Sequence, residues 1–174
     1  MAFINMKYLL IGLVLGLVVG CGYIAIRYVL SSKLRTAQDL EHGFGITVLG
    51  CVAEQNSSKR VGTKEDQIGV IVANVKLIME RQGKQKVFLT GGSATERCCG
   101  VIDAIAQGLK DQGMDCAVGV SVVNDVDSIS KVADADAVVL VEEIDVSGYE
   151  TIKKEKELCE QCKIPVLGSV VLVA

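Results

Sequence analysis

The chain has 174 residues, of which 50% are hydrophobic and 22% charged, a composition that excludes a disordered or collagen-like protein. Its length suits one domain of ordinary size plus an appendage. Aromatic residues make up 4%, tryptophan is absent and the net charge is −3, so we expect no nucleic-acid partner and no general affinity for polyanions.

Charge is distributed unevenly along the chain. Up to Thr36 the charged side chains are four basic ones, whereas after it 14 basic residues face 21 acidic residues. The sequence therefore joins a basic, apolar head to an acidic body. We predict a short extracytoplasmic end at 1–6, a transmembrane helix at 7–30, a juxtamembrane segment and linker at 31–66, and an α/β kinase-like domain at 67–174.

An uncharged stretch of 19 residues, from Tyr8 to Ile26, predicts the membrane-spanning helix. At a rise of about 1.5 Å per residue it would be roughly 28 Å long, close to the thickness of the hydrocarbon layer. One basic residue, Lys7, precedes the stretch, and three basic residues follow it before Thr36. The positive-inside rule therefore predicts a single-pass protein of the cell membrane with its C-terminal domain in the cytoplasm.

Small residues in this stretch leave alternatives open. Gly12, Gly16 and Gly20 recur at four-residue spacing, either as a stripe for packing against another membrane helix or as glycine tolerated in lipid. A lipoprotein is a rival interpretation, because residues 18–21 resemble a lipobox that ends at Cys21. The apolar run continues past Cys21, and six further cysteines suit a reducing compartment, so the membrane span is favoured.

Helical and strand-like patterns alternate through the rest of the chain. The segment 31–40 is polar, with a helix start near Thr36, and residues 46–52 predict a short strand. Residues 54–66 are polar and predict a linker. Further helices are predicted at 68–79, 101–109, 126–133 and 149–158, and further strands at 86–90, 116–123, 137–141 and 164–173. This alternation predicts an α/β fold with a parallel sheet that helices cover on both faces.

The loop after the strand at 86–90 is where we expect a ligand, because open parallel sheets bind ligands beyond the carboxyl ends of their strands. A working phosphate loop has the pattern GxxxxGK[ST], and neither glycine of this loop starts such a pattern. No lysine lies between Lys86 and Lys110. The loop is therefore either an empty structural turn or a weak anion site made of backbone amides. The candidate cofactor-binding residues of this degenerate phosphate loop are Gly91, Gly92, Ser93 and Thr95.

Other candidate residues have a structural explanation beside the functional one. Cys159 and Cys162 have CxxC spacing without a second ligand pair, which favours two reduced thiols at or near the surface. Glu142 and Glu143 follow a strand and suit a cation, although solvated acids at a strand end explain them as well. With a single histidine, His42, no Ser-His-Asp set is credible, and we predict no catalytic residue and no metal site.

Several stretches resemble known sequences. Residues 9–16 are similar to the last membrane span, and residues 33–41 and 45–50 to the cytoplasmic signature, of bacterial polysaccharide co-polymerases, also called chain-length determinants. The body resembles their associated tyrosine autokinases: residues 86–90 are similar to the strand before the phosphate loop, and residues 133–141 and 164–168 to two later strands.

The resemblance implies a P-loop-NTPase-like domain that has lost catalysis. Cys98 and Cys99 stand about where the lysine and the hydroxyl residue of the phosphate loop are expected. Residues 116–120 carry no acid where the second nucleotide motif is expected, and Tyr149 is the only tyrosine beyond the membrane segment. The first span and the outer domain of a chain-length determinant have no counterpart, which suggests a fragment or a reduced form.

The function implied is that of a membrane-anchored regulatory or scaffolding subunit of capsular or exopolysaccharide biosynthesis. It would need no cofactor, and its partners would be the membrane, other membrane helices or co-polymerase subunits, a tyrosine kinase or polysaccharide polymerase, or a second copy of itself. One alternative is a kinase-like ATPase that binds ATP with magnesium. A second alternative is an extracytoplasmic lipoprotein with a binding domain.

Overall fold

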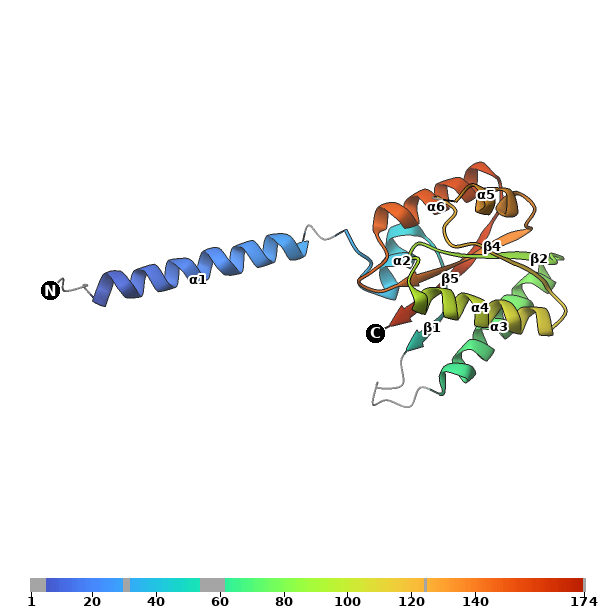
Figure 1. Ribbon diagram of the computed structural model, residues 1–174, viewed down its shortest axis with the longest axis horizontal. Coiled ribbons are helices and arrows are strands. Elements are labelled where there is room, and N and C mark those ends of the chain that lie inside the picture. The colour runs from blue at the N-terminus through green and yellow to red at the C-terminus, as the bar shows by residue number, and fades with distance from the viewer. Residues whose placement is uncertain (1–5, 30–31, 54–61, 124, 174) are drawn as a thin grey trace. The chain divides into compact units, whose positions relative to one another are not determined.

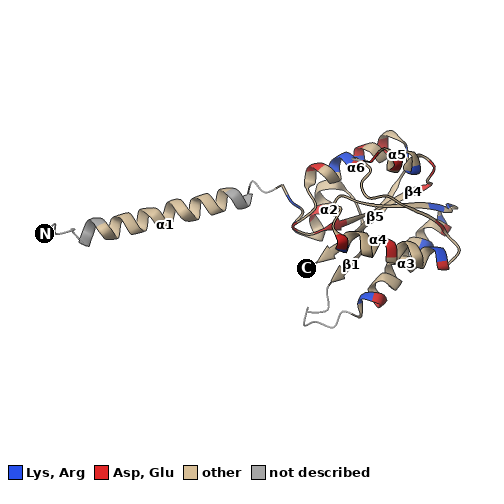
Figure 2. Ribbon diagram, viewed as in Figure 1, with Lys and Arg blue, Asp and Glu red and all other residues tan. Residues whose placement is uncertain are grey.

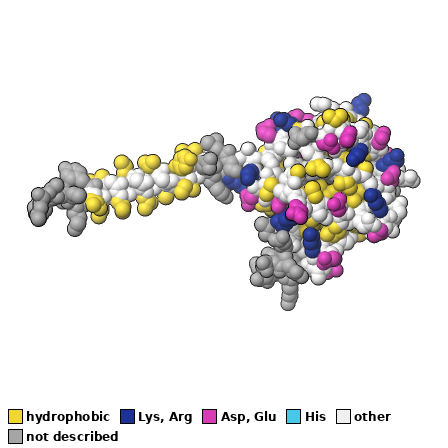
Figure 3. Space-filling view, in the orientation of Figure 1, with side chains coloured by type: hydrophobic (Ala, Val, Ile, Leu, Met, Phe, Trp, Pro, Cys, Tyr) yellow, Lys and Arg dark blue, Asp and Glu magenta, His cyan; other side chains and the backbone are white. Residues whose placement is uncertain are grey.

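The computed structural model describes residues 6–29, 32–53, 62–123 and 125–173, which fall into two compact units divided between Ser32 and Lys33. The first unit contains one helix, α1 (Met6–Val29), close to the predicted span. From Leu9 to Ile26 its mean hydropathy is 2.6, and its described side chains are exposed and apolar (Figures 2 and 3). By length and composition α1 can cross a membrane.

The second unit is built on a five-stranded sheet in which every strand pairing is parallel (Figure 1). Its spatial order is β1-β5-β4-β2-β3. The strands are β1 (Val48–Ala53), β2 (Lys86–Gly91), β3 (Asp115–Val118), β4 (Ala137–Glu143) and β5 (Val166–Val173). The parallel α/β fold predicted from the sequence is thereby confirmed.

Among the described residues, five helices cover the two faces of this sheet and enclose two apolar cores. The helices are α2 (Ala37–Phe44), α3 (Lys64–Arg81), α4 (Glu96–Asp111), α5 (Val126–Ala133) and α6 (Tyr149–Gln161). One core contains residues of α3 and α4, and the other contains residues of α2, α5 and α6. The cores are aliphatic, and Phe88 of β2 is the only aromatic residue among their fully buried members in the described chain.

The predicted boundary between linker and domain is wrong on its N-terminal side. Residues 31–66 were expected to lie outside the domain, yet β1 pairs with β5 inside the sheet, and α2 packs Leu40 into the core. The predicted linker also ends early, because α3 begins at Lys64 behind the capping residue Thr63. Residues 54–61 of that predicted linker lie outside the described residues. The predicted strand at 116–123 ends at Val118.

Side chains of α3 protect the edge of the sheet at β1. The Gln67 side-chain oxygen accepts a hydrogen bond from the Ala53 amide at 2.9 Å, and the Asn74 side chain donates to the Leu49 carbonyl at 3.4 Å. These bonds satisfy backbone groups of a strand that has a single sheet neighbour, β5. The edge is therefore partly closed to further strands.

The segment that follows α1 in sequence docks on the loop between β4 and α6. The Leu34 amide donates to the Ser147 carbonyl at 2.8 Å, and the Asp145 amide donates to the Leu34 carbonyl at 2.7 Å. Leu34 is completely buried, and Lys33 forms a bridge with Gly148. Residues 33–34, predicted to lie in a juxtamembrane segment outside the domain, are thus an integral part of it.

Candidate functional site

The loop that follows β2 lies at the topological switch point of the sheet. β2 and β4 are hydrogen-bonded neighbours, but the helices that follow them pack on opposite faces, α4 in one core and α6 in the other. In open α/β sheets the diverging loops at such a point leave a crevice at the carboxyl ends of the strands, and ligands bind there. The position of the predicted phosphate loop is therefore the one that the fold offers to a ligand.

Each predicted residue of the degenerate phosphate loop has a defined place. Gly91 ends β2, and a Cβ there would stand 2.6 Å from the Val141 carbonyl, so this position accepts glycine only. Gly92 and Ser93 follow in the loop. Thr95 caps α4, because its hydroxyl accepts a hydrogen bond from the Cys98 amide at 3.1 Å. The structure thus brings these four residues together between β2 and α4.

A carboxylate lies against this loop. A Cβ at Gly92 would stand 2.8 Å from Oε2 of Glu142, which comes from the end of the neighbouring strand β4. A phosphate group that approached the Gly92 amide would meet this oxygen and its charge. The nearest lysines in sequence, Lys86 and Lys110, lie at the start of β2 and near the end of α4, away from the loop.

Glu142 and Glu155 of α6 form an acidic pair. Both side chains are completely buried, and each carboxyl group shifts the pKa of the other. Burial raises the pKa of Glu142 to about 7, against the stabilising influence of the Ser147 hydroxyl and the Gly92 amide. Burial, together with the charge of Glu142, raises the pKa of Glu155 to about 9. The expectation of solvated acids at this strand end is therefore wrong for Glu142.

Glu143, the next residue of β4, is also largely buried but has partners. Its carboxylate accepts a hydrogen bond from the Thr95 hydroxyl at 2.6 Å and lies 3.5 Å from the Arg97 guanidinium. Arg97 also donates to the carbonyl of Val173 at the end of β5. This Thr95–Glu143–Arg97 network ties the start of α4 to the ends of β4 and β5.

The cysteines near the site are structural. Cys98 is fully buried in the core, and burial raises the pKa of its thiol to about 12, which keeps it protonated and unreactive. Cys159 is likewise buried with a pKa raised to about 12, whereas Cys162 is exposed at the end of α6. The prediction of two thiols at or near the surface is therefore wrong for Cys159. All seven cysteines are free.

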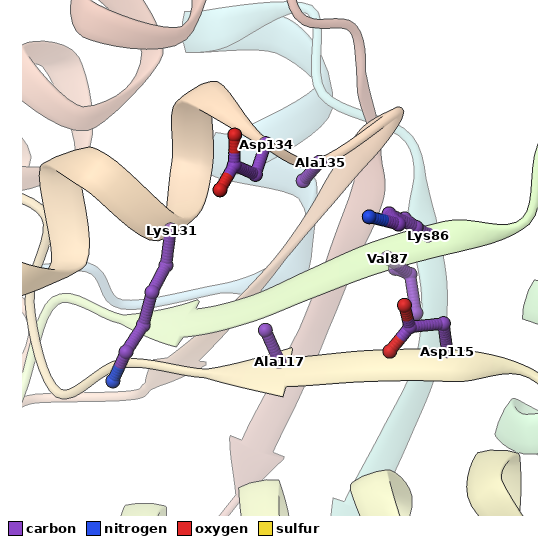
Figure 4. A pocket seen from close by; sticks show the side chains of 7 residues that line it. All are labelled: Lys86, Val87, Asp115, Ala117, Lys131, Asp134 and Ala135. Atoms are coloured by element: carbon purple, nitrogen blue, oxygen red, sulfur yellow. The ribbon is translucent and has the colours of Figure 1, made fainter.

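A separate hollow of about 140 Å³ lies near the residues where β2 and β3 begin (Figure 4). Lys86 and Asp115 line it from the first residues of β2 and β3, and Lys131 and Asp134 line it from the end of α5. Its volume is below that of ordinary ligand pockets, and it lies at the amino ends of the strands. We assign no function to it.

Solved structures share this architecture, although no protein-family model and no curated protein matches the sequence. The chimerical protein CapA2B2 is 13% identical, with a TM-score of 0.64 over 79% of this chain and 98% of that one. The BceF tyrosine kinase domain is 8% identical, with a TM-score of 0.63 over 80% of this chain and 98% of that one. The body has a tyrosine-kinase-like fold.

Within this kinase-like fold, the loop could be predicted from the sequence, whereas the place of Glu155 could not. The signal was present in α6, where Ile152, Glu155 and Cys159 recur at the spacing of one helix face and are all buried. A glutamate between two apolar positions of such a face is a buried acid. The pattern could not show that it would meet Glu142, since that contact depends on how α6 packs over β4.

Proposed function

We propose that the chain is a membrane-anchored, non-catalytic subunit of capsular or exopolysaccharide biosynthesis, in which the kinase-like domain scaffolds or regulates a partner. The tyrosine-kinase-like fold and the apolar helix α1 support this assignment. The partners we propose are other membrane helices, co-polymerase subunits of the chain-length type, or an active tyrosine kinase or polymerase. A role in chain-length determination is part of the same proposal.

One observation carries the non-catalytic part of the proposal. The loop at the switch point has no lysine to neutralise a triphosphate, and the carboxylate of Glu142 lies against Gly92 where backbone amides would have to cradle the phosphates. Phosphoryl transfer depends on positive charge around the transferred group. Gly91, Gly92, Ser93 and Thr95 therefore serve to shape the loop and to cap α4.

The first prediction concerns nucleotide binding by the full chain in detergent micelles. Titration with ATP and magnesium at pH 8, followed by calorimetry, should show no saturable binding below millimolar concentration, because the loop presents negative charge. Glu142→Gln removes that charge at similar volume and should strengthen binding of the nucleotide, whereas the exposed Glu157→Gln should not. Micromolar binding by the unchanged chain would instead establish the alternative, a nucleotide-binding kinase-like ATPase.

The second prediction concerns topology. Cys51 and Cys162 are exposed, so both are accessible to a thiol reagent on whichever side of the membrane the domain lies. A membrane-impermeant maleimide should leave them unlabelled in intact cells and label them after lysis, because the positive-inside rule predicts a cytoplasmic domain. Labelling in intact cells, together with a diacylated Cys21 in the mass spectrum, would establish the lipoprotein alternative.

A further inference from the structure

The acidic pair buries two carboxyl groups without a positively charged partner. Six buried side-chain oxygens of the described residues have no hydrogen-bond donor in good geometry, and they belong to Thr90, Ser93, Glu142 and Glu155. Neither glutamate takes part in an ion pair among the described residues. Two carboxylates in contact, shielded from water and without a cation, cannot both be ionised at a reasonable free energy.

The groups around the pair do not supply a counter-charge. On β5 the residue opposite Glu142 is Val171, and in the loop after β2 its neighbour is Gly92. Glu143 of β4 accepts the hydrogen bond from Thr95 and forms the ion pair with Arg97. The remaining titratable neighbours among the described residues are the buried thiols Cys98 of α4 and Cys159 of α6, which stay neutral because burial, and then the charge of the carboxylates, raises their pKa.

We propose that the acidic pair holds a shared proton and acts as a pH-sensitive latch that fixes α6 and the loop between β4 and α6 to the end of the sheet. The protonated carboxyl group of Glu155 donates a hydrogen bond to the carboxylate of Glu142. The proton thus joins the middle of α6 to the last residues of β4.

The latch reaches the membrane-proximal segment through Ser147. The Ser147 hydroxyl stabilises the charged form of Glu142 and accepts a hydrogen bond from the Glu143 amide at 2.9 Å. The carbonyl of the same residue accepts the hydrogen bond from the Leu34 amide. Release of the proton therefore loosens the loop on which residues 33–34 dock.

The direction of the pH effect follows from the raised pKa values. The closed pair keeps protons up to about pH 7 for Glu142 and about pH 9 for Glu155, whereas the opened glutamates titrate near their ordinary value of 4.5. The stabilisation is thus complete below about pH 4.5 and is lost as the pH rises through the values of the closed pair. Between pH 7 and pH 9, opening of the pair releases one proton. The equilibrium constant for opening should therefore increase about tenfold per pH unit.

The test uses the full chain in detergent micelles. Infrared spectra at pH 8 should contain the C=O stretch of a protonated carboxyl group, and Glu155→Gln should remove it. Hydrogen exchange should show protection factors of the Leu34 and Asp145 amides that fall about tenfold per pH unit from pH 7 to pH 9. In Glu155→Gln, whose amide still donates to Glu142, the same protection should stay flat, while the exposed Glu157→Gln should behave as the unchanged chain.

Several outcomes would overturn the latch. They are the absence of the protonated band at pH 8, protection of Leu34 and Asp145 that does not change with pH, and an unaltered pH dependence in Glu155→Gln. A rise in melting temperature with calcium or magnesium that Glu155→Gln abolishes would also overturn it, because a metal ion would then balance the charge. The infrared spectra and hydrogen exchange of the unchanged chain test the latch even if the variant does not fold. Nucleotide binding does not enter these readouts, so the latch and the proposed function fail independently.

Discussion

Replacement of Arg97 by leucine should lower the free energy of unfolding by about 2–3 kcal/mol, because it leaves Glu143 without its cation in a largely buried position. The Arg97 side chain is 25% exposed and that of Glu143 is 10% exposed, so water can compensate only in part. The Val173 carbonyl loses a donor in the same variant. Urea unfolding of the full chain in detergent, followed by circular dichroism, measures the effect.

Two further variants show whether the loss of stability comes from the unpaired carboxylate of Glu143. Arg81→Leu, at the exposed end of α3, should change the stability by no more than about 0.5 kcal/mol. The double variant Arg97→Leu/Glu143→Leu should recover part of the loss, because it removes the orphaned carboxylate as well. If the double variant loses at least as much stability as the two single variants lose together, Arg97 and Glu143 do not stabilise each other, and the ion pair assigned to the network is wrong.

Truncation of Phe88 to alanine should have the largest effect on stability, about 3–5 kcal/mol. The ring is completely buried in the core beneath α5 and α6, and it packs against the backbone of Gly119, where a Cβ would collide with it. Gly119 has no side chain that could fill the space that the ring leaves. Thermal unfolding of the variant beside the unchanged chain provides the measurement.

Two comparisons test the cause of that loss. Phe88→Leu keeps most of the volume and should be clearly less destabilising than Phe88→Ala. Val126→Ala removes an apolar side chain that is 81% exposed, and it should leave the stability within about 0.5 kcal/mol. An alanine variant of Phe88 as stable as the Val126 variant would mean that the core on this face closes around the cavity.

Much of the fold could be predicted from the sequence because its signals are local. The helix at 126–133 was predicted with the bounds of α5, and Asp125 caps it through its side chain. The strands β2, β4 and β5 are continuous apolar runs, as parallel strands buried on both faces must be. β1 was also predicted as a strand, yet its place in the sheet was not, since pairing with β5 joins segments more than 100 residues apart.

The candidate site was harder to predict because it depends on long-range packing. The loop after β2 could be placed from the order of strand, glycines and helix. The acid that faces it comes from β4, and the partner of that acid comes from α6, so neither contact has a signature in a single segment. The exposure expected of Glu142 follows from the average behaviour of glutamate, which a shared proton overrides.

The hydrogen bonds from α3 to β1 bear on how copies of this protein can assemble. Because Gln67 and Asn74 occupy backbone groups of β1, a second chain cannot easily extend the sheet on that side, and β3 at the other border offers only four residues. Proteins guarded in this way resist the stacking of strands that seeds fibrils. Self-association of this chain should therefore proceed through helical surfaces and not through added strands.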